Sequence, residues 1–422
     1  MAENIKWISG GNMRPAEPVP LDAFTWEEAN RARNFHRTID GYRETPLVSL
    51  PNLAEYWGLG GVYVKDESHR FGLNAFKVLG GSYAIGRYLA ERLGMDISEL
   101  PFGRLRSGDL RSRLGDIAFV TATDGNHGRG VAWTASRLGF RSIVYMPAGS
   151  SPTRLEAIRR AGAEAEILDM NYDDCVRHAV RMAERHGWVV VQDTAWEGYE
   201  TIPLWIMQGY ASLAVEAIEQ FKALGVPKPT HILLQAGVGS FAGAVAALFA
   251  SVYGDERPAI VIVEPNKADC LYRSAVAGER RIVEGAMDTI MAGLACGEPN
   301  PIAWQLLRRF GDMFVSCPDS VAAMGMRMLG NPLKGDPAVI SGESGAVTAG
   351  LLDHLMTDPA MAEAKARLGL DLSSRVLLIS TEGDTDPSRY RDVVWDGMFP
   401  SRAGRGRNLI GPAKAPKVGT EG

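Results

Sequence analysis

Short apolar runs that alternate with longer helical patterns constrain the fold of this chain most. The alternation extends from about residue 60 to residue 385. Most runs are continuous stretches of Val, Ile and Leu, as is typical of strands covered on both faces. They predict strands at Gly61–Lys65, Ile117–Thr123, Arg141–Met146, Glu164–Asp169, Trp188–Asp193, His231–Gln235, Ala259–Glu264 and Arg375–Thr381. This order predicts an α/β fold with mainly parallel sheets.

Length and charge narrow the class of protein. At about 150 residues per domain, 422 residues predict two or three domains. The 45 Lys and Arg against 50 Asp and Glu give a net charge of −5, which argues against nucleic-acid or anionic-membrane partners. The first residues lack the apolar core of a signal peptide, and no run reaches the roughly 18 apolar residues of a membrane span. We therefore expect a soluble protein of the cytoplasm.

The first segment with chemical character surrounds Lys77. A glycine turn at Gly72 precedes a helix that we expect to begin near Asn74, because Asn is a good N-cap. Lys77 would then lie in the first helical turn, where the helix dipole disfavours a cation. That penalty would lower the pKa of Lys77 and favour the free amine that a Schiff base requires. A solvated helix lysine is the alternative.

A glycine-rich loop separates a later strand from its helix. Gly237, Gly239 and Gly243 let backbone N–H groups turn inward, and Ser240 adds a hydroxyl group. With the N-terminus of the next helix, they would form a phosphate site. The loop matches neither a P-loop nor a regular G-x-G-x-x-G motif. Glu264 lies 21 residues beyond Gly243, so a dinucleotide site in an oxidoreductase and a purely structural turn stay alternatives.

A third loop, Thr123–Gly128, also joins a predicted strand to a helix. Its amides could hold a carboxylate, as backbone nests do. Asp124 would project from the carboxyl end of the strand, where α/β sheets place their ligands. Alternatively, Asp124 is an N-cap and His127 a surface residue.

Together these segments resemble those of the fold-type II pyridoxal-phosphate enzymes, the tryptophan synthase β-like family. The family pattern is a lysine before a glycine-containing helix, a Thr/Ser-x-Gly-Asn loop, a glycine-rich phosphate cup and a Ser/Thr at the last strand. The four parts occur in this order as Asn74–Lys77, Thr123–Gly128, Gly237–Gly243 and Ile379–Gly383. The likeness covers roughly residues 40 to 390 and implies two doubly wound α/β domains that bind pyridoxal 5′-phosphate.

Within that family the chain is most similar to the diaminopropionate ammonia-lyases. The likeness lies in Phe71–Lys77, Thr123–Gly130, Gln192–Tyr199 and Met291–Glu298. Serine/threonine dehydratases and cysteine synthases have a small residue where Asp124 stands, which favours an additional acid–base group here. The resemblance implies α,β-elimination of D- and L-2,3-diaminopropionate to pyruvate and two ammonia. A serine/threonine dehydratase-like lyase, a racemase and a non-catalytic pyridoxal-phosphate or amino-acid sensor stay alternatives.

The resemblance also implies roles for single residues. Lys77 would form the Schiff base with the cofactor and take the proton of the L substrate, and Asp124 would take that of the D substrate. Asn126 would meet the ring hydroxyl oxygen and Thr381 the pyridine nitrogen, while Glu343 resembles a residue beside the ring. The phosphate would lie against Gly237, Val238, Gly239, Ser240 and Gly243.

Further residues are expected around the substrate. Asp193, at the end of its strand, is the candidate for holding the cationic 3-amino group, with a helix or loop cap as the alternative. The other substrate-binding candidates are Thr123, Gly125, His127 and Tyr172. Cys270 and Cys296 are expected at the mouth of the site and could pair, although cytosolic thiols are usually reduced. The four cysteines form no CxxC motif, so we expect no metal site.

The family likeness divides the chain into regions. Residues 1–84 and 206–398 would form a larger cofactor-binding domain, and residues 85–205 a smaller mobile domain inserted into it. Residues 399–422 carry basic side chains among Gly and Pro, and we expect a flexible tail. A homodimer is expected from the likeness alone.

Overall fold

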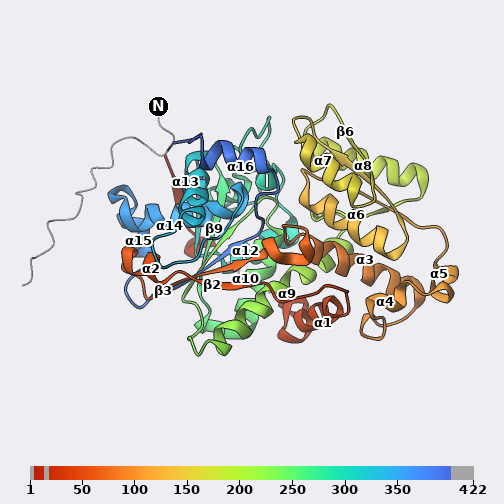
Figure 1. The fold of residues 1–422 in the computed structure, drawn as a ribbon, viewed down its shortest axis with the longest axis horizontal. Helices are drawn as coiled ribbons and strands as arrows, with labels where there is room; N and C mark the ends of the chain where they lie inside the picture. The colour runs from red at the N-terminus through yellow and green to blue at the C-terminus, as the bar shows by residue number, and fades with distance from the viewer. Residues whose placement is uncertain (1–3, 14–18, 401–422) are drawn as a thin grey trace, which may run out of the picture.

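The computed structural model describes residues 4–13 and 19–400, which build two separate sheets (Figure 1). The larger sheet has the order β1 (Lys6–Ser9), β10 (Met313–Cys317), β9 (Ala259–Pro265), β8 (His231–Gln235), β11 (Arg375–Ser380), β3 (Gly61–Asp66) and β2 (Leu47–Ser49). The smaller sheet has the order β6 (Glu164–Ile167), β5 (Arg141–Met146), β4 (Ala118–Ala122) and β7 (Val189–Val190). The edge strands β1 and β2 pair antiparallel, and the inner strands pair parallel.

The predicted α/β class with mainly parallel sheets is therefore confirmed. Each of the eight predicted strands has a counterpart, although the one predicted at Trp188–Asp193 is reduced to the two residues of β7. The chain leaves the sheet there, which places Asp193 in a loop. The predicted alternation began only at about residue 60, so it missed β1, which pairs with β10. A four-residue, half-buried edge strand carries too little periodicity to be recognised.

Two hydrophobic cores lie on opposite faces of the larger sheet. Ile232 and Leu234 of β8 belong to one core, and Leu233 between them belongs to the other. The helices of the first face are α1 (Trp26–Arg37), α3 (Val78–Leu93), α9 (Thr201–Ala223) and α10 (Ser240–Tyr253). Those of the second face include α2 (Pro51–Trp57), α13 (Asp319–Gly330) and α14 (Glu343–Thr357). Burial on both faces explains why the strands read as continuous apolar runs.

The smaller sheet carries its own helices, on the right of Figure 1. These are α6 (Asn126–Leu138), α7 (Pro152–Arg160) and α8 (Tyr172–His186). Helix α3 packs against both α9 and α6 and so joins the two sheets. A Cβ atom at Gly130 of α6 would lie 2.9 Å from the backbone N and Cα of Val78. The missing side chain therefore lets α6 approach the first turn of α3.

The remaining helices are α4 (Phe102–Leu105), α5 (Gly108–Leu114), α11 (Cys270–Ala277), α12 (Pro301–Phe310), α15 (Ala362–Leu368) and α16 (Pro387–Val394). Among them, α12 packs against α10 and contributes buried residues to the first core. No helix of the described residues is long and apolar enough to cross a membrane. Strands of the larger sheet come from residues 6–66 and 231–380, and those of the smaller sheet from residues 118–190. The tail predicted for 399–422 falls almost wholly on 401–422, outside the described residues.

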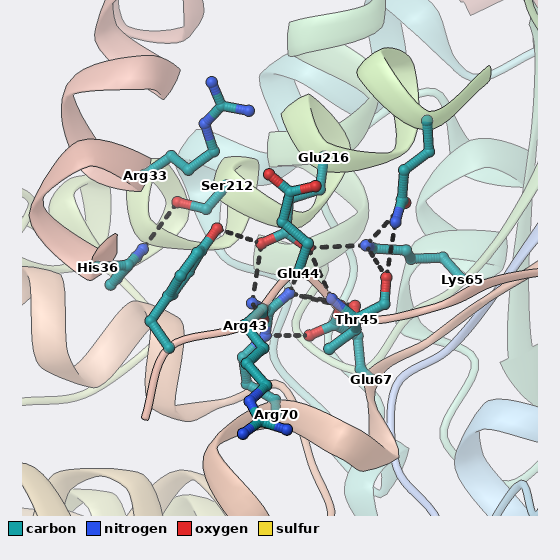
Figure 2. A network of polar contacts seen from close by, with 12 residues as sticks. Arg33, His36, Arg43, Glu44, Thr45, Lys65, Glu67, Arg70, Ser212 and Glu216 are labelled. Atoms are coloured by element: carbon teal, nitrogen blue, oxygen red, sulfur yellow. Dashed lines mark hydrogen bonds and ion pairs between the residues drawn. The ribbon is translucent and has the colours of Figure 1, made fainter. Parts of the chain in front are cut away.

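A buried ionic network anchors the chain between β3 and α3 (Figure 2). Glu216 of α9 accepts hydrogen bonds from Lys65 Nζ at 2.7 Å and from the Arg70 guanidinium at 2.7 and 2.8 Å. Glu67 accepts two further bonds from Arg70, both of 2.9 Å. Burial favours the neutral acid, but Arg70 and Lys65 hold the pKa of Glu216 well below its ordinary value. The network thus fixes the loop before Lys77 on α9.

Candidate active site

One pocket brings most of the predicted site residues together. Most of the segments that form it follow the carboxyl ends of β4, β7, β8 and β11 or begin α3, and the starts of α8 and α14 and residues 293–296 complete it. The predicted residues that line it are Lys77, Thr123, Asp124, Asn126, His127, Tyr172, Asp193, Gly237, Val238, Gly239, Ser240 and Thr381. The predicted residues Gly125, Gly243 and Glu343 do not belong to its lining.

Lys77 immediately precedes α3 instead of lying within it. Asn74 has a left-handed backbone with φ of 55°, and α3 begins at Val78, so the predicted helix start was wrong. Asn tolerates this conformation better than most residues because its short polar side chain can bond locally. The Nζ atom of Lys77 donates a hydrogen bond to Asp193.

The ionisation of Lys77 also differs from the prediction. Burial lowers the pKa of Lys77, but the Asp193 carboxylate outweighs this effect and holds the pKa above its ordinary value. Conversely, burial favours the neutral form of Asp193, but the Lys77 ammonium lowers the pKa of Asp193 to about 2. The expected free amine was therefore wrong for this structure. The helix dipole acts over one turn, whereas a contacting carboxylate acts at hydrogen-bond distance.

Hydrogen bonds hold the backbone of Asp193 as well as its side chain. Its carbonyl oxygen accepts a hydrogen bond from the Ser240 hydroxyl group. The Asn300 amide donates to the Ser240 oxygen at 2.7 Å. The Ser240 hydroxyl group thus joins the glycine-rich loop to the loop after β7.

Asp124 lies beside an arginine that the sequence analysis missed. Arg154 of α7 lies 3.9 Å from Asp124 Oδ2 and donates to Glu343 Oε1 at 2.5 Å. Burial raises the pKa of Asp124, against the opposing charges of Arg154 and Lys77. Burial likewise raises the pKa of Glu343, to about 7, against Arg154. Nothing in the Arg-rich sequence of α7 distinguishes Arg154 from its solvated neighbours.

The loop after β4 is shaped by its own side chains. The Thr123 hydroxyl oxygen accepts hydrogen bonds from the backbone N–H groups of Gly125 and Gly128, at 2.9 and 3.1 Å. Asn126 begins α6, and its side chain donates to the Glu382 carboxylate. Glu382 was missed, although its place directly after Thr381 is a usable signal.

His127 is buried, so the alternative of a surface residue was wrong. Its Nε2 atom lies 2.8 Å from the Val191 carbonyl oxygen, which can only accept, so Nε2 carries a proton. Burial lowers the pKa of His127, although the nearby Asp193 opposes this, and the ring is neutral near pH 7. Its Nδ1 atom is then an acceptor without a partner among the described residues.

Gln235 sets the direction of the Thr381 hydroxyl group. The Gln235 Nε2 atom donates to Thr381 Oγ1 at 2.7 Å and to the Ile379 carbonyl oxygen at 2.9 Å. The Thr381 oxygen is therefore used as an acceptor, and its proton is free to donate. Gln235 was missed, although it is the last residue of a predicted strand.

The glycine-rich loop presents backbone donors at a helix N-terminus. Gly239 is the N-cap of α10, and its φ of 95° is a backbone conformation that residues other than glycine rarely adopt. Among the described residues, no group accepts from the backbone N–H groups of Gly237, Val238 and Gly239. Free amides that converge at the positive end of a helix form an anion site. The prediction of a phosphate site thus agrees with the local geometry.

The structure bears on two alternatives from the sequence, a dinucleotide site at Glu264 and a pairing of Cys270 with Cys296. Glu264 accepts hydrogen bonds from the backbone of Leu271 and Tyr272 at the start of α11, at 2.9 and 2.6 Å, and is fully buried. It is unavailable to a ribose, so the dinucleotide interpretation was wrong. Cys270 and Cys296 are both buried free thiols, and Cys296 lines the pocket.

Ten lining residues are not among the predicted cofactor- and substrate-binding residues, although Cys296 was expected at the mouth of the site. Most are apolar or small, and they differ little from core residues in the sequence. They are Phe76, Gln235, Ala236, Phe241, Ala242, Gly293, Leu294, Cys296, Ser344 and Glu382.

Comparisons with known proteins agree with this geometry. The family model of pyridoxal-phosphate dependent enzymes matches residues 38–368. Diaminopropionate ammonia-lyase of Escherichia coli is 54% identical over 382 residues, which cover 90% of this chain and 94% of that protein. The chain belongs to this family of pyridoxal-phosphate dependent enzymes. The diaminopropionate ammonia-lyase of Salmonella typhimurium is 55% identical over 366 residues, 86% of this chain and 91% of that protein.

Solved structures of these enzymes share the fold. The holo form of the Escherichia coli diaminopropionate ammonia-lyase superposes with a TM-score of 0.88 and 51% identity, covering 94% of this chain and 98% of that chain. A second structure of that enzyme, with a TM-score of 0.87, contains an aminoacrylate–pyridoxal-phosphate azomethine reaction intermediate. The predicted fold-type II class and the predicted cofactor are thereby confirmed.

The residues of the pocket fit pyridoxal phosphate. The free amides of Gly237–Gly239 suit its phosphate, and Lys77 supplies the primary amine that its aldehyde requires. The Thr381 hydroxyl proton, with its oxygen occupied by Gln235, suits an unprotonated ring nitrogen.

Proposed function

We propose that this pyridoxal-phosphate dependent enzyme eliminates ammonia from D- and L-2,3-diaminopropionate. One molecule of water and one of substrate would give pyruvate and two ammonia. The observation that carries the proposal is the buried Asp193 carboxylate, which already binds an alkylammonium group, that of Lys77. A second amino group on the substrate needs such a partner, and serine does not. The identity to diaminopropionate ammonia-lyases, 54% and 55%, supports the proposal.

When bound, pyridoxal phosphate supplies the electron sink that allows the Cα–H bond of an amino acid to break. Lys77 would hold it covalently, Ser240 would complete the phosphate cup with the loop amides, and Asn126 would donate toward its ring hydroxyl oxygen. Gly243 would act from outside the lining, because its N–H group donates to the Gly239 carbonyl oxygen. Thr381 offers a neutral hydroxyl group instead of a carboxylate, and as the partner of the ring nitrogen it would leave that nitrogen unprotonated. This weaker electron sink favours β-elimination over transamination.

Two bases would serve the two enantiomers. Because the Cα protons of D and L substrates point to opposite faces, Lys77 Nζ would take the proton of the L form and Asp124 that of the D form. A base must be ionised, and Arg154 at 3.9 Å opposes the effect of burial on Asp124. Glu343 would act from behind Arg154, since it does not line the pocket.

Departure of the 3-amino group depends on its charge. Ammonia leaves readily only from a protonated nitrogen, so the substrate must be held as an ammonium. Asp193 would bind this group once Lys77 is engaged with the cofactor. Thr123, His127 and Tyr172 would surround the remainder of the substrate, and Gly125, outside the lining, would hold the loop through its bond to Thr123.

A pyruvate assay tests the proposal. The purified protein is incubated with D- and L-2,3-diaminopropionate and with D- and L-serine, and pyruvate is measured with lactate dehydrogenase and NADH. We expect faster turnover of diaminopropionate, and loss of both turnover and the cofactor's visible absorbance in Lys77→Ala. Faster turnover of serine would contradict the proposal in favour of a dehydratase, and inversion of substrate without pyruvate would indicate a racemase.

Three further properties belong to this proposal. The division into a larger domain (1–84 and 206–398) and a smaller one (85–205) is supported by the sheet to which each strand belongs. A homodimer and a cytoplasmic location are proposed from the family. Light scattering coupled to gel filtration tests the first of these two, and cell fractionation the second.

A further inference from the structure

Gln192 lies directly before Asp193 but does not line the pocket. Its side chain is 0% exposed. The Tyr199 hydroxyl oxygen accepts from the backbone N–H of Gln192 at 2.9 Å, and the same hydroxyl group donates to the Val190 carbonyl oxygen at 2.9 Å. These bonds hold the backbone of Gln192 against the end of β7.

The side-chain amide of Gln192 has one consistent orientation. Its Oε1 atom lies 3.0 Å from the backbone nitrogen of Ala122 and 2.8 Å from Thr121 Oγ1. A backbone N–H can only donate, so the side-chain atom that faces it must be the oxygen. The amide nitrogen therefore faces the Tyr172 hydroxyl oxygen, 2.8 Å away, and donates to it.

This bond decides what the Tyr172 hydroxyl group can do. Because its oxygen accepts from Gln192, its proton must point elsewhere, and no described residue accepts that proton within hydrogen-bond distance. Tyr172 lines the pocket. Burial, and to a smaller extent the charge of Asp193, raises the pKa of Tyr172 well above its ordinary value. The phenol therefore keeps its proton. Tyr172 is thus a neutral donor that faces the site.

We propose that Gln192 is a positioning residue that directs the Tyr172 hydroxyl proton toward the Asp193 carboxylate when the substrate is bound. In this structure the Lys77 ammonium compensates the charge of Asp193. Under the proposed function, on which this inference rests, Lys77 is engaged with the cofactor and Asp193 receives the second ammonium group of the substrate. The bond from Tyr172 keeps Asp193 ionised and oriented for that group. The pair thereby favours 2,3-diamino acids over 3-hydroxy amino acids.

Three single substitutions and their combinations test whether Gln192 orients the Tyr172 hydroxyl proton or only supports packing. Gln192→Glu keeps an oxygen for Thr121 and Ala122 but presents a second oxygen to Tyr172, so the hydroxyl proton turns away from Asp193. Gln192→Met has a similar shape but no amide group, so it does not orient the Tyr172 hydroxyl proton. Tyr172→Phe removes the hydroxyl group. Combined with Gln192→Glu, it removes the hydroxyl group but keeps an oxygen for Thr121 and Ala122, whereas Gln192→Met leaves the backbone N–H of Ala122 without that acceptor.

Selectivity is the first readout, as the ratio of kcat/KM for diaminopropionate to kcat/KM for serine. A buried hydrogen bond to a charged group corresponds to roughly a tenfold change or more. We expect Gln192→Glu to lower the ratio at least about tenfold and Gln192→Met to lower it less. In the Tyr172→Phe background, neither Gln192 substitution should lower it further, because no hydroxyl group remains to be directed.

Binding without turnover is the second readout. The probes are 2-methyl-2,3-diaminopropionate and 2-methylserine, which lack the Cα–H bond, and calorimetry on the holoenzyme gives each Kd. We expect Gln192→Glu to weaken the first probe at least about tenfold and to leave the second unchanged.

Equal weakening of both probes, or a Gln192 effect that persists in Tyr172→Phe, would show that Gln192 only supports packing and would overturn the inference. Unaltered selectivity in both Gln192 variants would do the same. The unmutated enzyme tests the proposed function separately: if it prefers serine, that function fails, whatever the variants do.

Discussion

Glu216→Gln should reveal how strongly the buried ionic network of Figure 2 stabilises the larger sheet. Besides the bonds from Lys65 and Arg70, Glu216 accepts from the Tyr42 hydroxyl group at 2.6 Å and from the backbone N–H of Thr45 at 3.3 Å. The substitution keeps the shape but leaves two buried cations with Glu67 as their remaining carboxylate. Removal of one partner from a buried ion pair typically costs about 3–5 kcal/mol. We expect the free energy of unfolding to fall by that amount.

Urea denaturation followed by tryptophan fluorescence measures this loss at pH 7. Glu363→Gln is the matched control, because Glu363 pairs with Arg367 on the surface and its side chain is 68% exposed. Surface pairs contribute less than about 1 kcal/mol. A loss for Glu216→Gln as small as that of the control would refute the reasoning.

The stability that Glu216 contributes should depend on pH. The folded state lowers the pKa of Glu216, so the stability that its charge contributes is present above the unfolded value, about 4.3, and is lost as the pH falls further. The difference between the unmutated protein and Glu216→Gln should therefore shrink below about pH 4. Since the network fixes the loop before Lys77, the variant should also retain less cofactor, as its visible absorbance would report.

Three other predictions concern the site and its surroundings. Asp124→Asn should lower kcat on D-diaminopropionate by about 100-fold or more and spare the L form, and equal losses would exclude Asp124 as the second base. Gly130→Ala would place a Cβ atom 2.9 Å from the backbone of Val78, so it should destabilise by about 1–3 kcal/mol in thermal unfolding, whereas Gly103→Ala, with open space, should not. Burial raises the pKa of Asp173 to about 6, so Asp173→Asn should raise the melting temperature at pH 8 but not at pH 4.

Much of the site could be predicted because its chemistry lies in short segments. The lysine before α3, the loop after β4 and the glycines before α10 each combine residue types that are recognisable within about eight positions. Parallel strands then bring their carboxyl ends to one edge, which gathers these segments in one pocket. Residues such as Gln235 and Gln192 were missed, because the sequence does not show which partner a glutamine side chain will meet.

The amino-acid sequence by itself determined the α/β class, the family and which side chains carry the chemistry, since these follow from local patterns of burial and residue type. Only the tertiary structure decided their charge states. Lys77 and Asp193 are 116 residues apart in the chain, yet their contact makes the lysine an ammonium and the acid a carboxylate. The free energy of an ionised group depends on the charges and the solvent that surround it, and these are set by the folding of distant segments against one another.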